Sequence, residues 1–166
     1  MNQPTIALND GQHIPQLGLG VWQVPDDITA KVVTEALAAG YRSIDTARIY
    51  DNESSVGAAL AASGLPRHEL FITTKLWNSA HGYDAALRGF DASLRRLGLD
   101  YVDLYLIHWP APRKNLYVET WRALIELHKQ GRARSIGVSN FHIPYLQRIL
   151  DETGVVPVLN QIELHP

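Results

Sequence analysis

The stretch YVDLYLIHW, residues 101–109, is apolar or aromatic at nearly every position and ends in a histidine and a tryptophan. Before it, apolar side chains recur every three or four residues from Ala86 to Leu97, and Gly98 ends this pattern. The spacing is typical of a helix that buries one face. Nearly continuous apolar runs are typical of parallel strands covered by helices. Residues 101–109 are therefore predicted to form a buried parallel strand that follows a helix.

The same unit of helical pattern and apolar run recurs along the chain. Further strand-like runs occupy residues 14–22, 41–45, 70–76, 133–139 and 157–164. Amphipathic patterns separate most of these runs. The first follows Pro25, with Asp26 or Asp27 as its cap and Ile28 on its buried face, and it stops at Gly40. This alternation predicts βαβ units and a parallel sheet.

Two architectures are compatible with repeated βαβ units: a doubly wound sheet and a (β/α)8 barrel of the TIM type. The dinucleotide fingerprint of the first is absent, because Gly18-Leu19-Gly20 is followed by Val21-Trp22-Gln23 and lacks the third glycine. The opening segment instead predicts a hairpin over about residues 5–15, with Asn9-Asp10-Gly11 as its turn. Such a hairpin could close the bottom of a barrel.

The number of predicted strands is too small for a closed barrel of this type. A complete (β/α)8 barrel takes about 250 residues, whereas the chain has 166 residues and six predicted barrel strands. We therefore expect one partial barrel domain over residues 1–166, corresponding to the N-terminal part of the full fold.

Composition excludes several classes of protein. A net charge of −2 and a sequence pI of about 6.4 give no reason to expect nucleic acid or an anionic membrane as a partner. No apolar run is long enough to span a membrane, and the N-terminus lacks a secretory signal, so a cytoplasmic protein is expected. The absence of cysteine excludes disulfides and thiol catalysis. The histidines show neither His-x-His nor HExxH spacing, so no metal site is predicted.

Polar side chains follow five successive predicted strands, at the end where α/β barrels build their active sites. They are Asp45, Lys75, His108, the pair Ser139-Asn140, and Gln161. Each has an ordinary alternative role: a helix cap, an exposed lysine, a core histidine, or a turn residue. Tyr50, five residues after Asp45, could be a packing aromatic. Taken together at one edge of a sheet, these residues predict an active site.

The chemistry of this set favours carbonyl reduction. A buried Lys75 ammonium needs a partner, and Asp45 is the obvious one. Lys75 beside Tyr50 favours the phenolate form, which makes the phenol a proton donor to a developing alkoxide. His108 could bind the same oxygen and orient the carbonyl. Hydride must come from a cofactor, for which nicotinamide is the natural donor. The groups suited to hold its carboxamide are Ser139, Asn140 and Gln161.

At these residues the chain resembles the aldo-keto reductase family. The matching stretches are GYRSIDTARIYDNE (40–53), LFITTKLW (70–77), LGLDYVDLYLIHWP (97–110), ARSIGVSNF (133–141) and NQIELHP (160–166). Within the family, the chain is most similar to bacterial 2,5-diketo-D-gluconic acid reductases and their neighbours. The resemblance implies NADPH-dependent reduction of a small dicarbonyl or sugar-derived carbonyl substrate to an alcohol.

The resemblance also implies roles for individual residues. Tyr50 would be the proton donor, Lys75 and Asp45 its tuning pair, and His108 the orienting group. Contacts to the cofactor are implied for Ser139, Asn140, Gln161 and Asp45. With His108, the substrate pocket would be lined by Trp22, Trp77 and Trp109, for which barrel-rim packing is the alternative. Trp121 lies on a helical stripe and is expected in the core.

Three alternatives remain open from the sequence. The family pattern continues beyond NQIELHP, so the chain could be a truncated, inactive fragment or a binding module that keeps the fold. Full-length relatives are expected to be monomers, whereas six strands with exposed sheet edges are expected to self-associate. A lysine at a barrel strand end could also form a Schiff base, which would make Lys75 the nucleophile of a lyase.

Overall fold

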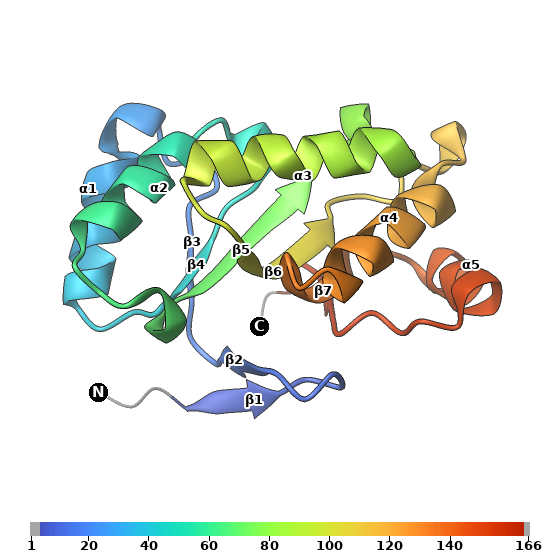
Figure 1. Ribbon diagram of the computed structural model, residues 1–166, viewed down its shortest axis with the longest axis horizontal. Coiled ribbons are helices and arrows are strands. Elements are labelled where there is room, and N and C mark those ends of the chain that lie inside the picture. Colours follow the sequence, from blue (N-terminus) through green and yellow to red (C-terminus); the bar gives the residue numbers. More distant parts are fainter. Residues whose placement is uncertain (1–3, 165–166) are drawn as a thin grey trace.

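The computed structural model describes residues 4–164, which form a small hairpin and a parallel sheet. The hairpin pairs β1 (Thr5–Ala7) and β2 (His13–Pro15) antiparallel. The sheet has six parallel strands in chain order: β3 (Leu19–Gly20), β4 (Ser43–Asp45), β5 (Phe71–Leu76), β6 (Val102–Ile107), β7 (Ala133–Ser139) and β8 (Asn160–Gln161). This curled half-barrel confirms the prediction of a partial (β/α)8 fold with an N-terminal hairpin (Figure 1).

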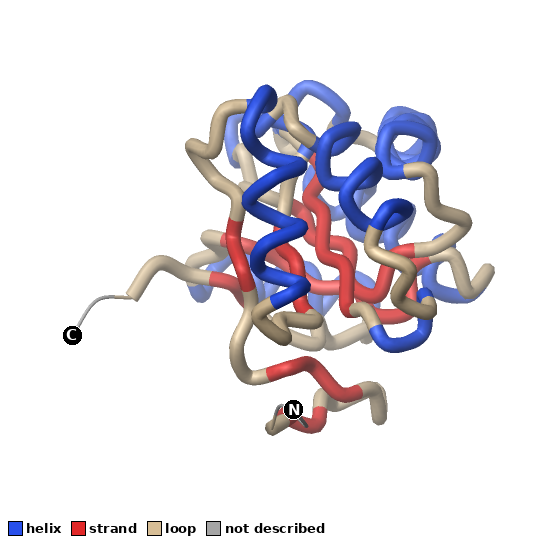
Figure 2. Tube along the Cα trace, turned by 90° about the vertical axis from the view of Figure 1, so that its left-hand side faces the viewer, coloured by secondary structure: helices blue, strands red, loops and turns tan. Residues whose placement is uncertain are grey.

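Helices connect the strands and cover the outside of the sheet, as Figure 2 shows. The α-helices of the described residues are α1 (Asp26–Ala38), α2 (Glu53–Ala62), α3 (Tyr83–Leu97), α4 (Tyr117–Lys129) and α5 (Ile143–Thr153). Short 3-10 helices lie at Arg48–Tyr50, Arg67–Glu69, Asn78–Ala80 and Pro112–Lys114. None of the helices in residues 4–164 is long and apolar enough to cross a membrane.

The central strands match their sequence pattern most closely. Every residue of β5 and β6 is buried, because helices cover one face and the barrel interior the other. The outer runs were predicted too long. Residues 14–22 contribute only the end of β2 and the two-residue β3, and residues 157–164 contribute only β8. β2 pairs with β1 in the hairpin, whereas β3 pairs with β4 in the parallel sheet, so the run is divided between two sheets.

The first turn of α1 buries a different residue from the one predicted, while the rest of the predicted face is as expected. Ile28 is 45% exposed, while Thr29, Val33 and Leu37 are buried. Thr29 Oγ1 donates to the carbonyl oxygen of Pro25 at 2.8 Å, which holds this polar side chain against the sheet side of the helix. The helix begins at Asp26 after Pro25 and has no side-chain cap, so the prediction of an aspartate cap was wrong.

The hairpin lies under the amino-terminal end of the sheet, below the strands in Figures 1 and 2. Asp10 Oδ2 accepts a hydrogen bond from Ser135 Oγ in β7 at 2.7 Å. Asn9 Nδ2 donates to the carbonyl oxygen of Pro157 at 3.2 Å. The predicted turn therefore ties the hairpin to β7 and to the loop before β8. On α4, Trp121 is fully buried and donates to the Val155 carbonyl, as expected for a core residue.

Gly57→Ala is expected to destabilise the fold. The C-terminal end of α3 lies against α2 (Figure 1), and a Cβ at Gly57 would lie 2.7 Å from the carbonyl carbon and 2.9 Å from the Cα of Leu97. Backbone cannot rotate away, so we expect a loss of about 3 kcal/mol in the free energy of unfolding, measured with urea. Gly20→Ala, whose Cβ would meet no atom within 4 Å, is the control. Equal stability of the two variants would contradict this packing.

Candidate active site

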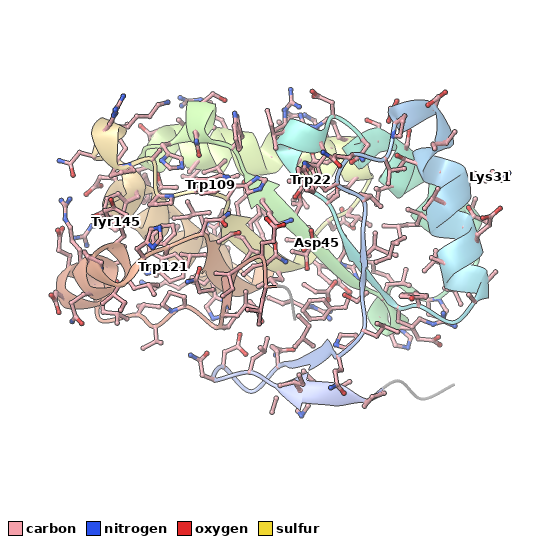
Figure 3. All side chains as sticks on the ribbon, turned by 180° about the vertical axis from the view of Figure 1, so that it is seen from behind. Trp22, Lys31, Asp45, Trp109, Trp121 and Tyr145 are labelled. Atoms are coloured by element: carbon pink, nitrogen blue, oxygen red, sulfur yellow. The ribbon has the colours of Figure 1, made fainter. Side chains whose placement is uncertain are left out.

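The carboxyl ends of β4 to β8 bring the predicted polar side chains to one edge of the sheet. A cavity of about 650 Å³ opens there, between the loops that follow the strands. The predicted residues that line it are Trp22, Tyr50, Trp77, His108, Trp109, Ser139, Asn140 and Gln161. Figure 3 shows Trp22, Trp109 and Asp45 near the middle of the molecule, whereas Lys31 lies at its outer edge on α1.

Lys75 lies behind Tyr50 and is only 1% exposed. Its ammonium donates to the Asp45 carboxylate, to the carbonyl oxygen of Thr46 at 3.2 Å and to the Tyr50 hydroxyl at 3.2 Å. A buried ammonium is tolerated when acceptors surround it and one of them is anionic. The phenol oxygen of Tyr50 accepts from Lys75, so its own proton is free to be donated into the cavity.

The Asp45 carboxylate, on β4, accepts hydrogen bonds from side chains of two other strands, β5 and β8. The sequence reasoning missed the bond from β8. One carboxylate oxygen accepts from Lys75, and the other accepts from Gln161 Nε2 at 2.8 Å. Gln161 belongs to β8, so its amide reaches across the edge of the sheet to β4. This second bond fixes the orientation of the carboxylate that holds Lys75. No signal in the sequence distinguishes this contact from the predicted role of Gln161 in binding an amide.

Asn52 is a second residue that the sequence reasoning missed. It is fully buried, its Oδ1 accepts from Thr46 Oγ1 at 2.7 Å, and its Nδ2 donates to the carbonyl oxygen of Val21 at 3.0 Å. These bonds join the loop that carries Trp22 to the loop that carries Tyr50. The sequence carries no clear signal for them, because Asn52 precedes the polar start of α2, Glu53-Ser54-Ser55, where an asparagine is typical of a helix cap.

His108 lies between Tyr50 and Trp77, with ring centroids 5.7 Å and 5.3 Å away in edge-on contacts. Burial, with the positive charge of Lys75, lowers the pKa of His108 from 6.5 to about 4. The imidazole is therefore neutral at pH 7 and carries one N–H. A neutral imidazole can donate a hydrogen bond to a carbonyl oxygen in the cavity without bringing a second positive charge beside Lys75.

Ser139 and Asn140 form a polar shelf at the end of β7. Asn140 adopts a left-handed backbone conformation with φ of 61°, which turns the chain at the cavity. Its Nδ2 donates to the carbonyl oxygen of His108 at 3.1 Å and to Ser139 Oγ at 3.0 Å. Ser139 Oγ donates to the backbone oxygen of Gln161 at 2.9 Å. The three residues predicted to hold an amide are thus linked to one another.

Acid is expected to destabilise the protein through two histidines. Burial and the Lys114 charge lower the pKa of His81 from 6.5 to about 4, as burial and Lys75 do for His108. Since the unfolded chain binds protons more readily, stability is complete above pH 6.5 and falls as pH drops toward 4. Each histidine should contribute a loss of roughly 2 kcal/mol by pH 4.5.

Urea unfolding between pH 7.5 and 4.5 measures this dependence. The variant His81→Gln should show a shallower decline than the wild type, because one of the two titrating groups is gone. His128→Gln is a control, since His128 is exposed and its Nδ1–H donates to the carbonyl oxygen of Ala133 at 3.1 Å. The same decline with and without His81 would contradict the assignment.

Comparison with protein-family models identifies the fold at the level of a family. Residues 15–166 match the aldo/keto reductase family. The chain belongs to this family. The resemblance seen in the sequence motifs is thereby confirmed.

Individual aldo-keto reductases are similar over the whole chain. Methylglyoxal reductase DkgA of Yersinia pestis is 60% identical over 165 residues, which cover 99% of this chain and 58% of that protein. The crystal structure of an aldo/keto reductase from Brucella melitensis superposes with a TM-score of 0.96 at 61% identity, covering 99% of this chain and 64% of that one. The Bombyx mori aldo-keto reductase in complex with NADP has a TM-score of 0.91 at 42% identity, covering 99% and 59%.

The chain is shorter than its relatives. It spans about 60% of the length of the curated aldo-keto reductases that it matches. The residues of the candidate active site all lie within the matched part.

Proposed function

We propose that this aldo-keto reductase reduces small aldehydes and ketones to alcohols with NADPH. One observation carries the proposal: Lys75 Nζ is hydrogen-bonded both to the Asp45 carboxylate and to the Tyr50 hydroxyl, at the edge of the cavity. This arrangement suits a phenol that gives up its proton to an alkoxide, because the ammonium stabilises the phenolate left behind.

The polar shelf fits the carboxamide of a nicotinamide. Within residues 4–164, no hydrogen bond is made to Asn140 Oδ1 or Gln161 Oε1, although the amide nitrogens of both residues are bonded. These two oxygens can accept from the carboxamide NH₂, and Ser139 Oγ lies beside them. When bound there, NADPH supplies the hydride to the carbonyl carbon. Direct contact of Asp45 with the cofactor stays a prediction.

The protein's own groups then handle the carbonyl oxygen. His108, neutral at pH 7, donates a hydrogen bond that orients the carbonyl over the shelf. Tyr50 donates its proton as negative charge develops on that oxygen, and Lys75 stabilises the resulting phenolate. Trp22 and Trp109 line the cavity and offer apolar surface to the substrate.

The substrate is proposed to be a small dicarbonyl compound. The tryptophan-lined cavity suits compact carbonyl compounds, and a relative with 60% identity bears the name methylglyoxal reductase. The Schiff-base alternative receives no support, because Lys75 is 1% exposed and bonded to three acceptors. A lysine held by three acceptors in this way is poorly placed to attack a carbonyl carbon.

Methylglyoxal added to the protein and NADPH should cause a fall in NADPH absorbance that depends on both compounds. Tryptophan fluorescence quenching, recorded first, gives the Kd for NADPH independently of turnover. Binding with turnover supports the reductase. Binding without turnover of any of a panel of aldehydes and dicarbonyls would indicate a binding module, and absence of binding would overturn the proposal.

A further inference from the structure

A buried carboxylate lies on the helix-covered face of the sheet, behind the strand that carries Lys75. Glu53, the first residue of α2, is 1% exposed. One of its carboxylate oxygens accepts from Thr74 Oγ1 at 2.6 Å, and the other accepts from Arg96 Nε at 2.6 Å. Thr74 belongs to β5 and Arg96 to α3, so this carboxylate joins the start of α2 to a strand and to the neighbouring helix (Figure 1).

These contacts lie close to the bond between Lys75 and Tyr50. Thr74 immediately precedes Lys75 on β5, and successive side chains of a strand point to opposite faces. Glu53 follows soon after the 3-10 turn that carries Tyr50, beyond Asp51, which takes a left-handed conformation with φ of 56°. The carboxylate therefore fixes the start of α2 against β5 close to the point where Tyr50 meets Lys75.

A carboxylate at this position is costly, because a buried charge loses water and an apolar residue of similar volume often packs as well. The helix dipole offsets part of the cost, since it favours negative charge at the first turn of α2. The carboxylate also adds direction. Its two oxygens accept from donors on two different elements, which sets the height and rotation of α2 relative to β5, whereas apolar contacts are non-directional.

We propose that Glu53 is a positioning residue for the reduction and holds the Tyr50 hydroxyl at hydrogen-bonding distance from the Lys75 ammonium. Glu53 does not line the cavity and acts through the turn between β4 and α2. The distance between the hydroxyl and the ammonium is 3.2 Å, at the long end of the usual range, so a small shift of the turn breaks the bond. This inference rests on the proposed function, in which that bond prepares the proton donor.

The variants Glu53→Gln and Thr74→Val test the inference. Glutamine keeps the size of the side chain but has one acceptor oxygen in place of two, and valine keeps the shape of threonine without the hydroxyl. In both variants we expect kcat for methylglyoxal to fall by about 10- to 100-fold, since a displacement of about 1 Å caused far from the reacting atoms can cost this much. The KM for methylglyoxal and the Kd for NADPH should change by less than about threefold, because the residues that line the cavity are unchanged.

Asp103→Asn is the matched control. Asp103 is 5% exposed on β6 and accepts from Arg67 Nη2 at 2.6 Å and from the Ile72 N–H at 2.8 Å, at the amino end of the strands. Loss of this buried carboxylate should lower the urea midpoint, as Glu53→Gln does. It should leave kcat within about twofold of the wild type, because the active site lies at the other end of the strands.

An unchanged kcat in folded Glu53→Gln or Thr74→Val, or an equal loss of kcat in Asp103→Asn, would overturn the inference while the reductase stands. A wild type that binds NADPH but does not reduce methylglyoxal would instead count against the proposed function. The crystal structure of Glu53→Gln tests the positioning without turnover. The distance from Tyr50 Oη to Lys75 Nζ should exceed about 3.5 Å, and a distance that stays at 3.2 Å would overturn the inference.

Discussion

Tyr50→Phe should lower kcat by about 10³-fold while the Kd for NADPH changes by less than about twofold, since general-acid catalysis contributes roughly 10²- to 10⁴-fold. Phenylalanine keeps the ring that contacts His108 edge-on at 5.7 Å but lacks the hydroxyl that accepts from Lys75 at 3.2 Å. Without that proton, the developing alkoxide has no acid positioned to neutralise it. Steady-state kinetics with methylglyoxal and fluorescence titration with NADPH measure the two quantities.

Tyr83→Phe provides the control for Tyr50→Phe, because Tyr83 is 38% exposed at the start of α3 and does not line the cavity. It should retain wild-type kinetics. Activity of Tyr50→Phe within a few fold of the wild type would remove Tyr50 from the role of proton donor and would leave His108 as the remaining candidate.

Lys75→Met is expected to damage both stability and turnover. The Asp45 carboxylate would keep only its bond from Gln161, and a partly buried charge that loses its partner costs about 3 kcal/mol or more. Turnover should fall by at least about 10²-fold, because the phenolate of Tyr50 would lose the positive charge that stabilises it. Urea unfolding and steady-state kinetics measure these effects.

The double variant Asp45→Asn with Lys75→Met separates the two roles. It removes both charges of the pair, so most of the lost stability should return. Turnover should stay as low as in the single variant, since the positive charge beside Tyr50 is still absent. Recovery of turnover together with stability would show that Lys75 acts only as a structural partner of Asp45.

The parts of the fold that were predictable are those where one physical requirement dominates. β5 and β6 are buried on both faces, so their nearly continuous apolar runs indicate buried parallel strands. Parallel strands with helical connections place all carboxyl ends at one edge, so Tyr50, Lys75 and His108 could be assigned to one site before any geometry was known. The pairing of Lys75 with Asp45 followed from the cost of burying an ammonium.

Features set by contacts between distant segments were not predictable. The burial of Thr29 in place of Ile28 depends on the bond that Thr29 makes to Pro25, which the three-to-four spacing of apolar residues does not reveal. The bond from Gln161 to Asp45 joins residues 116 positions apart and depends on the curl of the sheet.

Some predictions concern cellular location, binding partners and the extent of the domain, and the structure of one chain tests none of them. The cytoplasmic location, the absence of nucleic-acid partners and the extent of the domain over residues 1–166 stay predictions from composition and pattern. Self-association also stays a prediction, and sedimentation of the purified protein measures it. The specific contacts that bind NADPH belong to the proposal.

The central claim is that nicotinamide gives hydride to a carbonyl carbon while Tyr50 gives the proton. It is tested most directly with NADPH deuterated at both C4 positions and a small dicarbonyl, followed by mass spectrometry of the alcohol. We expect one deuterium, bound to the carbinol carbon, and none in the product of the same reaction with unlabelled NADPH in ordinary water. An alcohol that forms without deuterium would contradict the account.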